Sequence, residues 1–160
     1  VVRLLDRILE VLVETAAYIY SRVRFEEGAP ERDRPLAGQS PYLVNAGFFY
    51  QYDDKGISAS LLYNRIGKRI ESVGVPMQNQ DEDIPDIYEM PRNSLDLTFS
   101  KKIGKIVEIK AGIQDILNSK VEYKQFVKLT DDKGGKSERE QLIRSYRPGV
   151  DINIGVSLRF

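Results

Sequence analysis

Hydrophobic and polar residues alternate along much of the chain, most regularly at its C-terminal end. From Val150 to Phe160 every second residue is apolar, and the residues between are polar or glycine. Side chains of a β-strand point to opposite faces in turn, so this pattern predicts a strand with one hydrocarbon face and one polar face. In a soluble sandwich such an apolar face meets a core, whereas in a membrane barrel it meets lipid and the polar face lines a wet interior.

The same alternation recurs in four earlier segments, at 42–52, 56–64, 93–101 and 105–114, and less regularly at 14–25. Each segment is close to the roughly 9–11 residues that a tilted strand needs to cross a bilayer. The pattern therefore predicts an all-β chain of about six strands.

The connections between these segments differ in length in a regular order. "DDKG" at 53–56 and "KIGK" at 102–105 are typical of tight turns, with glycine where a positive φ is wanted. Long polar segments lie at 26–40, 69–91 and 117–148. Unstructured loops beyond about 12–15 residues are uncommon in soluble domains, whereas outer-membrane barrels have long external loops and short periplasmic turns. We therefore expect an antiparallel up-and-down meander, part of a transmembrane β-barrel, with long loops on one side and short turns on the other.

The amino-acid composition argues against several classes of function. Lys plus Arg and Asp plus Glu number 24 each, which gives no basic excess for binding nucleic acid. The chain has no histidine and no cysteine, which removes the usual general base, thiolate chemistry and the commonest metal ligands. No nucleotide-binding fingerprint occurs. We expect no catalytic residues, no cofactor and no metal.

The first residues do not follow the strand pattern. Residues 1–13 fit a helical period better than a strand period, and the chain begins with Val1. We therefore treat 1–13 as an uncertain segment at a start that we expect to be truncated, and 14–160 as the strand-forming unit.

Three other groups of residues are candidates for particular roles. Aromatic residues near strand ends would suit the two membrane interfaces; these are Tyr18, Tyr20, Tyr42, Tyr50, Tyr52, Tyr63 and Phe160. The acidic residues Asp81, Glu82, Asp83 and Asp86 offer oxygen ligands for Ca²⁺, although a solvated loop needs no ion. Basic residues at a charged loop tip could meet lipopolysaccharide phosphates; these are Lys133, Lys136 and Arg139.

Five segments in order resemble the C-terminal barrel of TonB-dependent outer-membrane receptors, particularly those of the Bacteroidetes group. They are "RPLAGQSPYLVNAGFFY", "GISASLLYNRIGKRI", "PDIYEMPRNSLDLTFSKKIGK", "EIKAGIQDILNSKVEYKQ" and "SYRPGVDINIGVSLRF". The resemblance implies a large barrel around an N-terminal plug, in the outer membrane of a Gram-negative cell. It implies import of a nutrient such as a siderophore, glycan or other scarce solute. The chain departs from the family in lacking the signal peptide, TonB box and plug, so contact with the TonB complex would require N-terminal parts outside this sequence.

The resemblance also gives roles to two sets of residues. The final apolar residues match the strand read by the barrel-assembly machinery: Ile154, Val156, Leu158 and Phe160. The polar alternates would face the lumen, where they line a substrate path or brace the wall and contact the plug: Asn45, Gln51, Asp96, Glu108, Lys110, Gln114, Asp151, Asn153 and Arg159. The expected partners are outer-membrane lipid, lipopolysaccharide and the assembly machinery.

Two alternatives stay open at the level of sequence. The first is a soluble or secreted all-β ligand-binding module whose apolar faces pack inward. The second is a small pore-forming or adhesin-like barrel assembled from several copies. A chain that stays monomeric and folded in buffer without detergent would favour the first.

Overall fold

The computed structural model describes residues 8–18, 20, 35–75, 84–130 and 135–158. Apart from a short 3-10 turn, η2 (Asp53–Lys55), the described regular structure is entirely β. The strands are β1 (Ile8–Tyr18), β2 (Tyr42–Tyr52), β3 (Ile57–Ile66), β4 (Arg69–Ser72), β5 (Ile87–Glu89), β6 (Arg92–Ile103), β7 (Val107–Gln114), β8 (Val121–Thr130), β9 (Lys136–Tyr146) and β10 (Asp151–Leu158). The prediction of an all-β chain is confirmed.

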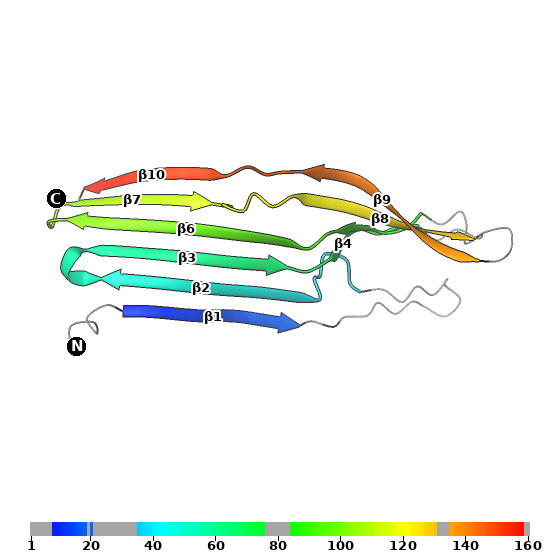
Figure 1. The fold of residues 1–160 in the computed structure, drawn as a ribbon, viewed down its shortest axis with the longest axis horizontal. Helices are drawn as coiled ribbons and strands as arrows, with labels where there is room; N and C mark the ends of the chain where they lie inside the picture. The colour runs from blue at the N-terminus through cyan, green and yellow to red at the C-terminus, as the bar shows by residue number, and fades with distance from the viewer. Residues whose placement is uncertain (1–7, 19, 21–34, 76–83, 131–134, 159–160) are drawn as a thin grey trace.

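The strands form two antiparallel sheets that lie end to end (Figure 1). The six-stranded sheet has the order β1-β2-β3-β6-β7-β10, which is an up-and-down meander. The four-stranded sheet has the order β4-β5-β8-β9 and lies beyond one end of the first. Because β4 and β5 prolong the hairpin of β3 and β6, and β8 and β9 prolong that of β7 and β10, two long hairpins supply the whole four-stranded sheet and four strands of the six-stranded sheet. Neither sheet is closed into a barrel.

The two predicted tight turns are present at the end of the molecule opposite the four-stranded sheet (Figure 1). Gly56 follows η2 with a φ of 57°, and Gly104 in the turn between β6 and β7 has a φ of 60°. Left-handed backbone of this kind costs glycine less than any residue with a Cβ, which explains its place in both turns.

Strand register places the alternating residues of neighbouring strands on common faces. Leu61 lies opposite both Phe48 and Leu97, and Ala111 lies opposite both Phe99 and Ile154. The resulting apolar face comprises Val44, Ala46, Phe48, Tyr50, Ile57, Ala59, Leu61, Tyr63, Leu95, Leu97, Phe99, Val107, Ile109, Ala111, Ile113, Ile152, Ile154, Val156 and Leu158. The other face, the polar face, is mostly Ser, Thr, Asn, Gln and charged residues.

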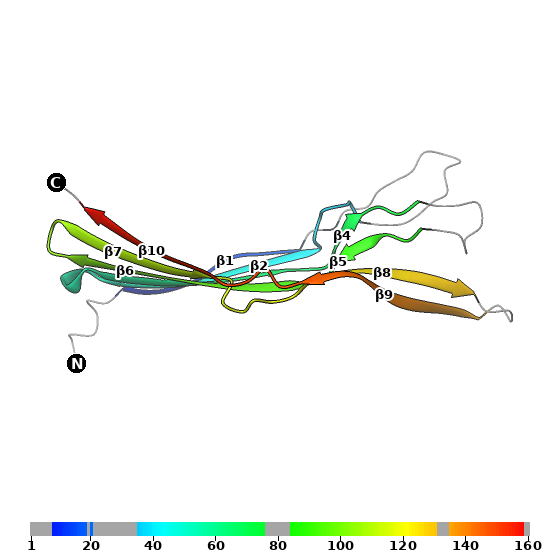
Figure 2. The same ribbon diagram turned by 90° about the horizontal axis from the view of Figure 1, so that it is seen from above.

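No described element covers the apolar face as a second layer. In the described part of the chain only Ile70, Val121 and Tyr123 are buried hydrophobic residues, and all three belong to the four-stranded sheet or its strands. On β10 the side chains of Ile152 and Ile154 are 69% and 76% exposed. Folded domains bury their apolar faces against another element, and the six-stranded sheet does not do so within the described residues. Figure 2, a view along the plane of this sheet, shows it as a single twisted layer.

Two expectations from the sequence are wrong in part. Segments 69–91 and 117–148 were expected to be loops, yet they contain β4, β5, β8 and β9. These strands form because each continues an existing hairpin, and extending a hairpin costs less free energy than starting one. The first described strand is Ile8–Tyr18, so it begins six residues before the predicted 14–25. It pairs with β2 from Ile8 opposite Gln51, so pairing with β2 overrides the helical period of residues 8–13.

Candidate functional site

The polar face of the six-stranded sheet is joined by side-chain hydrogen bonds between strands. Ser58 and Ser100 share a hydrogen bond of 2.7 Å between their hydroxyl oxygens, and Ser60 pairs in the same way with Thr98. Asn64 donates from its amide nitrogen to the side-chain oxygen of Asn45. These cross-strand pairs link β2, β3 and β6 and stabilise the sheet on this face.

Register places the eight described lumen candidates on the polar face: Asn45, Gln51, Asp96, Glu108, Lys110, Gln114, Asp151 and Asn153. Arg159 and Phe160 lie outside the described residues. The candidates are spread along the sheet and do not converge on one point. Glu108 is within 3.7 Å of the Lys110 ammonium on the same strand, and Gln51 donates to Asp53 at 2.7 Å. A Cβ on Gly112 would lie 2.7 Å from the Asn153 side-chain oxygen, so this glycine makes room for its neighbour.

A polar cluster marks the junction between the two sheets and was not predicted. Arg92 forms an ion pair with Asp115, and the Asp115 backbone amide donates to Asp96 at 2.8 Å. Arg92 Nε and Asp115 Oδ1 are buried and have no partner in the described part of the molecule. Asp115 has a φ of 53°, which bends the chain away from β7. Only Asp96 was recognisable from the sequence, because it lies in a regular strand.

One face of the four-stranded sheet carries a row of interacting side chains across its strands. Arg69, Glu89, Tyr123 and Arg144 are successive neighbours in the register. Arg69 Nε donates to the Glu89 carboxylate at 2.8 Å, and the Arg144 guanidinium lies 4.1 Å from the Tyr123 ring centroid. Burial raises the pKa of the Tyr123 hydroxyl, and the hydrogen bond from Arg144 opposes that shift.

The other face of the four-stranded sheet holds a lysine against two aromatic rings. The Lys68 ammonium lies 3.7 Å from the Phe126 ring centroid and 4.1 Å from that of Tyr88. The two rings meet edge to face with centroids 5.7 Å apart. Burial lowers the pKa of Lys68, while the nearby charges of Glu138 and Glu140 oppose the shift. These cation–π contacts hold Lys68, which precedes β4, against side chains of β5 and β8.

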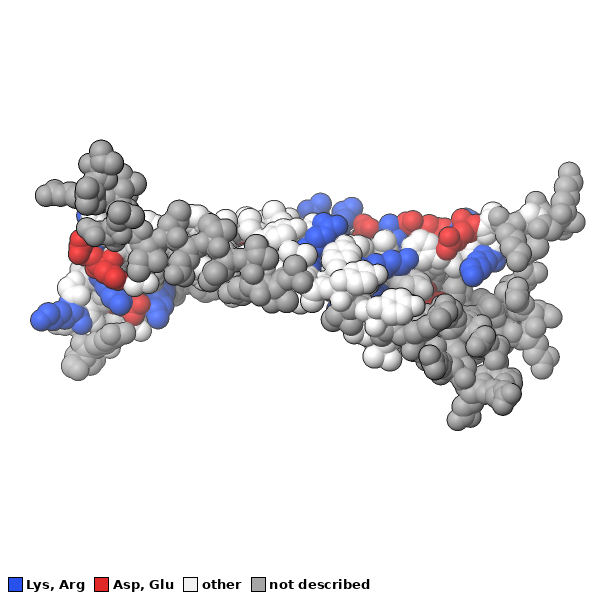
Figure 3. Space-filling view, turned by 90° about the horizontal axis from the view of Figure 1, so that it is seen from below, with Lys and Arg blue, Asp and Glu red and all other residues white. Residues whose placement is uncertain are grey.

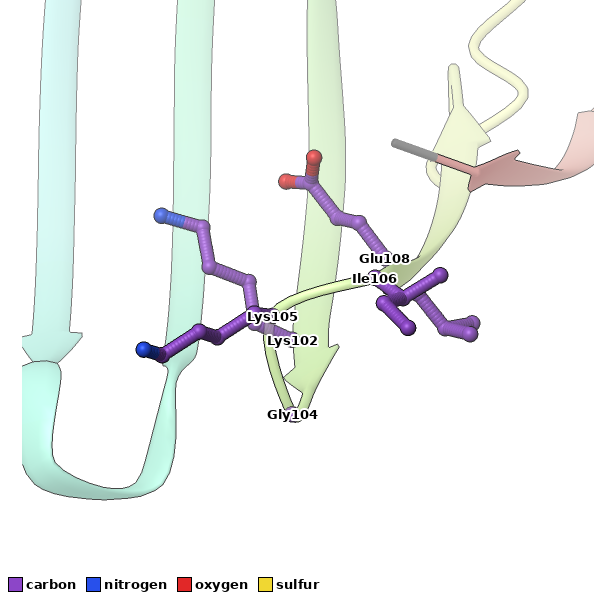
Figure 4. A pocket seen from close by; sticks show the side chains of 6 residues that line it. Lys102, Gly104, Lys105, Ile106 and Glu108 are labelled. Atoms are coloured by element: carbon purple, nitrogen blue, oxygen red, sulfur yellow. The ribbon is translucent and has the colours of Figure 1, made fainter. Parts of the chain in front are cut away.

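A hollow at the turn between β6 and β7 is lined by Lys102, Gly104, Lys105, Ile106, Val107 and Glu108, with a volume of about 30 Å³. That volume admits a water or two. Figure 4 shows the side chains of Lys102 and Lys105 extending to the same side of the turn. Within the described ranges no group of acidic residues is placed to hold a metal ion, and no helix is long and apolar enough to cross a membrane.

The structure describes some of the acidic and basic loop residues named as candidates above, and not others. Asp86 is buried and accepts a hydrogen bond of 2.7 Å from the Gly74 amide, which is a structural role in the connection between β4 and β5. Asp81, Glu82, Asp83 and Lys133 lie outside the described residues, as does the side chain of Lys136. Arg139 is on β9 and is exposed.

Polar and aromatic residues border the apolar face at both ends. At the end next to the four-stranded sheet, the Arg65 guanidinium lies 6.0 Å from the Tyr42 ring centroid. At the turn end, Lys101 lies opposite Ile57, and the Lys55 ammonium is 5.6 Å from the Tyr52 ring centroid. In the view of Figure 3, charged atoms lie at the left end and again from the middle of the molecule toward the right, and the described atoms between these two groups are white.

No protein-family model, curated protein or solved structure matches the chain.

Proposed function

We propose that this chain is a segment of the wall of an outer-membrane β-barrel. One observation carries the proposal: the register places the apolar residues of β2, β3, β6, β7 and β10 on a single uncovered face. An aqueous protein would have to hide this surface, whereas a lipid bilayer requires it.

The dimensions of the sheet agree with a bilayer. β2 has 11 residues and runs from Tyr42 to Tyr52, and at about 3.4 Å per residue step it spans roughly 34 Å along its own axis. A tilt of about 40° reduces this to roughly 26 Å of height, close to the apolar band of about 25 Å in outer-membrane barrels. Tyrosines at both ends of the strand would then lie at the two interfaces.

Within this proposal the chain is the C-terminal barrel part of a TonB-dependent receptor that imports a scarce nutrient, and it is a transporter and not an enzyme. This assignment rests on the five segments that resemble the family, together with the meander and its short turns at one end. The polar face then borders the lumen and braces the wall. The apolar residues of β10 then belong to the strand that the assembly machinery reads.

The experiment uses two neighbouring positions on opposite faces. The chain contains no cysteine, so Leu97→Cys and Thr98→Cys each give a single site for an environment-sensitive fluorophore. Leu97 is on the apolar face and Thr98 on the polar face at the same depth in β6. We expect lipids brominated in their acyl chains to quench the label at 97 strongly and the label at 98 weakly.

Two other outcomes would contradict this expectation. If neither label is quenched, and the chain remains folded and monomeric in buffer without detergent, the wall proposal is wrong. The soluble ligand-binding module then becomes the better description. A label quenched at 98 and not at 97 would mean that the two faces have been assigned the wrong way round.

A further inference from the structure

Arg65 is the last residue of β3 on the apolar face before the chain leaves the six-stranded sheet. Register places it opposite Val44 on one side and Asn93 on the other. Its guanidinium donates to the Asn93 side-chain oxygen at 3.0 Å, and Tyr63 donates from its hydroxyl to the same oxygen at 2.9 Å. Arg65 is therefore held by neutral polar groups at the rim of a hydrocarbon surface.

No described residue neutralises the positive charge of Arg65. Among the described residues Arg65 forms no ion pair, whereas Arg69 pairs with Glu89 and Arg92 pairs with Asp115. All three arginines lie within one stretch of the same long hairpin. An arginine with only Asn and Tyr for partners, at the edge of an apolar face, has donors and charge left for an anion from outside the chain.

Three tyrosines surround this rim. Tyr42 is on the same face as Arg65, Tyr18 lies opposite Tyr42 in the register and is 77% exposed, and Tyr63 is the preceding residue of this face. Tyrosine prefers the level of the lipid headgroups because its ring is apolar and its hydroxyl is a hydrogen-bonding group. The aromatic set thus marks the depth at which a headgroup would meet Arg65.

We propose that Arg65, flanked by Tyr42 and Tyr63, binds the phosphate of an anionic lipid headgroup in the leaflet beside the four-stranded sheet. This inference rests on the proposed function, since it requires the apolar face to meet lipid. A guanidinium presents parallel N–H donors that match two phosphate oxygens, and the Tyr42 hydroxyl can donate to a third. The site selects lipid by headgroup charge and not by acyl chain.

The test measures local lipid preference at this rim. A fluorophore on Val44→Cys lies opposite Arg65, and one on Ile152→Cys reports from the apolar face of β10, opposite Ile113 and away from both Arg65 and Lys101. Each is titrated with acyl-brominated phosphatidylglycerol and, separately, acyl-brominated phosphatidylcholine. One basic residue near a membrane surface favours an anionic lipid by about fivefold, and we expect that preference at 44 and none at 152.

Substitution of Arg65 completes the test. In Arg65→Gln the preference at 44 should disappear, and in Arg65→Lys it should persist in part because the charge remains. Added salt should reduce the preference of the unsubstituted protein, since exposed charges are screened. A preference that is unchanged in Arg65→Gln would overturn the inference.

The failure of this inference can be told apart from failure of the wall proposal. Equal quenching by both lipids at position 44 would contradict the phosphate site while leaving the apolar face in lipid. Absence of quenching by either lipid at both 44 and 152 would contradict the wall proposal, and the phosphate site with it.

Discussion

Ile154 and Asn153 are neighbours on β10 that face opposite sides of the six-stranded sheet. Ile154 is 76% exposed and belongs to the apolar face, and Asn153 is opposite Gly112 on the polar face. If lipid covers the apolar face, Ile154→Lys should lower the free energy of unfolding in vesicles by about 2–4 kcal/mol, the cost of a lysine near the bilayer midplane. Asn153→Lys, at the same depth, should cost much less because its charge reaches water.

Urea titration followed by tyrosine fluorescence measures both variants, since the chain has nine tyrosines and no tryptophan. In plain water a lysine at so exposed a position would be nearly neutral. Equal stability of Ile154→Lys and Asn153→Lys in vesicles would therefore count against lipid at this face.

Gly74 is a position where the structure admits no side chain. A Cβ there would lie 1.9 Å from the Ile84 carbonyl oxygen and 2.6 Å from the Pro85 carbonyl carbon, both backbone atoms. Gly74→Ala must therefore separate the two segments and break the hydrogen bond from its amide to Asp86. We expect a local loss of about 1–3 kcal/mol, measured as faster limited proteolysis between residues 69 and 89.

Gly155→Ala is the matched control, because a Cβ at Gly155 meets nothing within 4 Å. Proteolysis of this control should not change. If Gly74→Ala is cleaved no faster than the unsubstituted protein, the close approach of Gly74 to Ile84 is not present in solution.

The face of the sheet on which a residue lies could be predicted from the sequence where the residue belongs to a regularly alternating strand. Alternation assigned Leu97 and Ile154 to one face and Asp96 and Asn153 to the other, and the register agrees. The pairing of Arg92 with Asp115 was not predictable, because the two are 23 positions apart and meet through a turn with positive φ. No periodic pattern encodes such a turn.

At the scale of elements, a short turn joins β7 of the six-stranded sheet to β8 of the four-stranded sheet. Asn118 has a φ of 43°, accepts a hydrogen bond of 3.0 Å from the Gly149 amide at its side-chain oxygen, and accepts another at its carbonyl from Arg147. The turn after β7 therefore holds the connection between β9 and β10. It fixes the point at which the six-stranded sheet ends and the four-stranded sheet begins.

Three substitutions of Asn118 separate its two contributions. Asn118→Gly keeps the backbone conformation and loses the acceptor, Asn118→Asp keeps the acceptor, and Asn118→Ala loses both. A lost hydrogen bond of about 1 kcal/mol should speed hydrogen exchange at Gly149 by about fivefold in the Gly variant. The Ala variant should exchange faster still, because left-handed backbone costs alanine about 1–2 kcal/mol more.

Asn118→Asp should exchange like the unsubstituted protein. Exchange that is equally fast in all three variants would mean that the Asn118 side chain does not hold this connection.

The strands were predictable as elements where one face is apolar, and not elsewhere. β9 reads "KSEREQLIRSY", which has no continuous apolar face, and its described side chains are all exposed. It forms a strand because its partner β8 lies beside it across ten registered pairs. Such pairing depends on the neighbouring strand β8 and leaves no signal in the hydrophobic pattern of β9 itself. The same reason explains why segment 117–148 was expected to be a loop.

At the scale of the whole molecule, the six-stranded sheet has two open edges, at β1 and β10. Each edge carries backbone N–H and C=O groups without a strand partner, and in hydrocarbon every such group costs several kcal/mol. β1 and β10 run in opposite directions (Figure 1), so β10 of one copy can pair antiparallel with β1 of another. In lipid the wall must therefore be completed by other strands.

The chain on its own in vesicles is accordingly expected to associate edge to edge. Tyr18 lies at the end of β1 next to the four-stranded sheet and on the side of Tyr42, and Ile152 lies at the corresponding end of β10. Because antiparallel pairing of β1 with β10 brings these ends together, a variant with Tyr18→Cys and Ile152→Cys should form disulfide-linked oligomers in vesicles under mild oxidation. A variant with Tyr18→Cys and Leu158→Cys should not, since Leu158 is at the far end of β10 and the strands would have to slip by six residues.

Equal cross-linking in both variants would indicate aggregation without register. A folded monomer in vesicles, with no cross-link in either variant, would contradict the requirement that the open edges be paired.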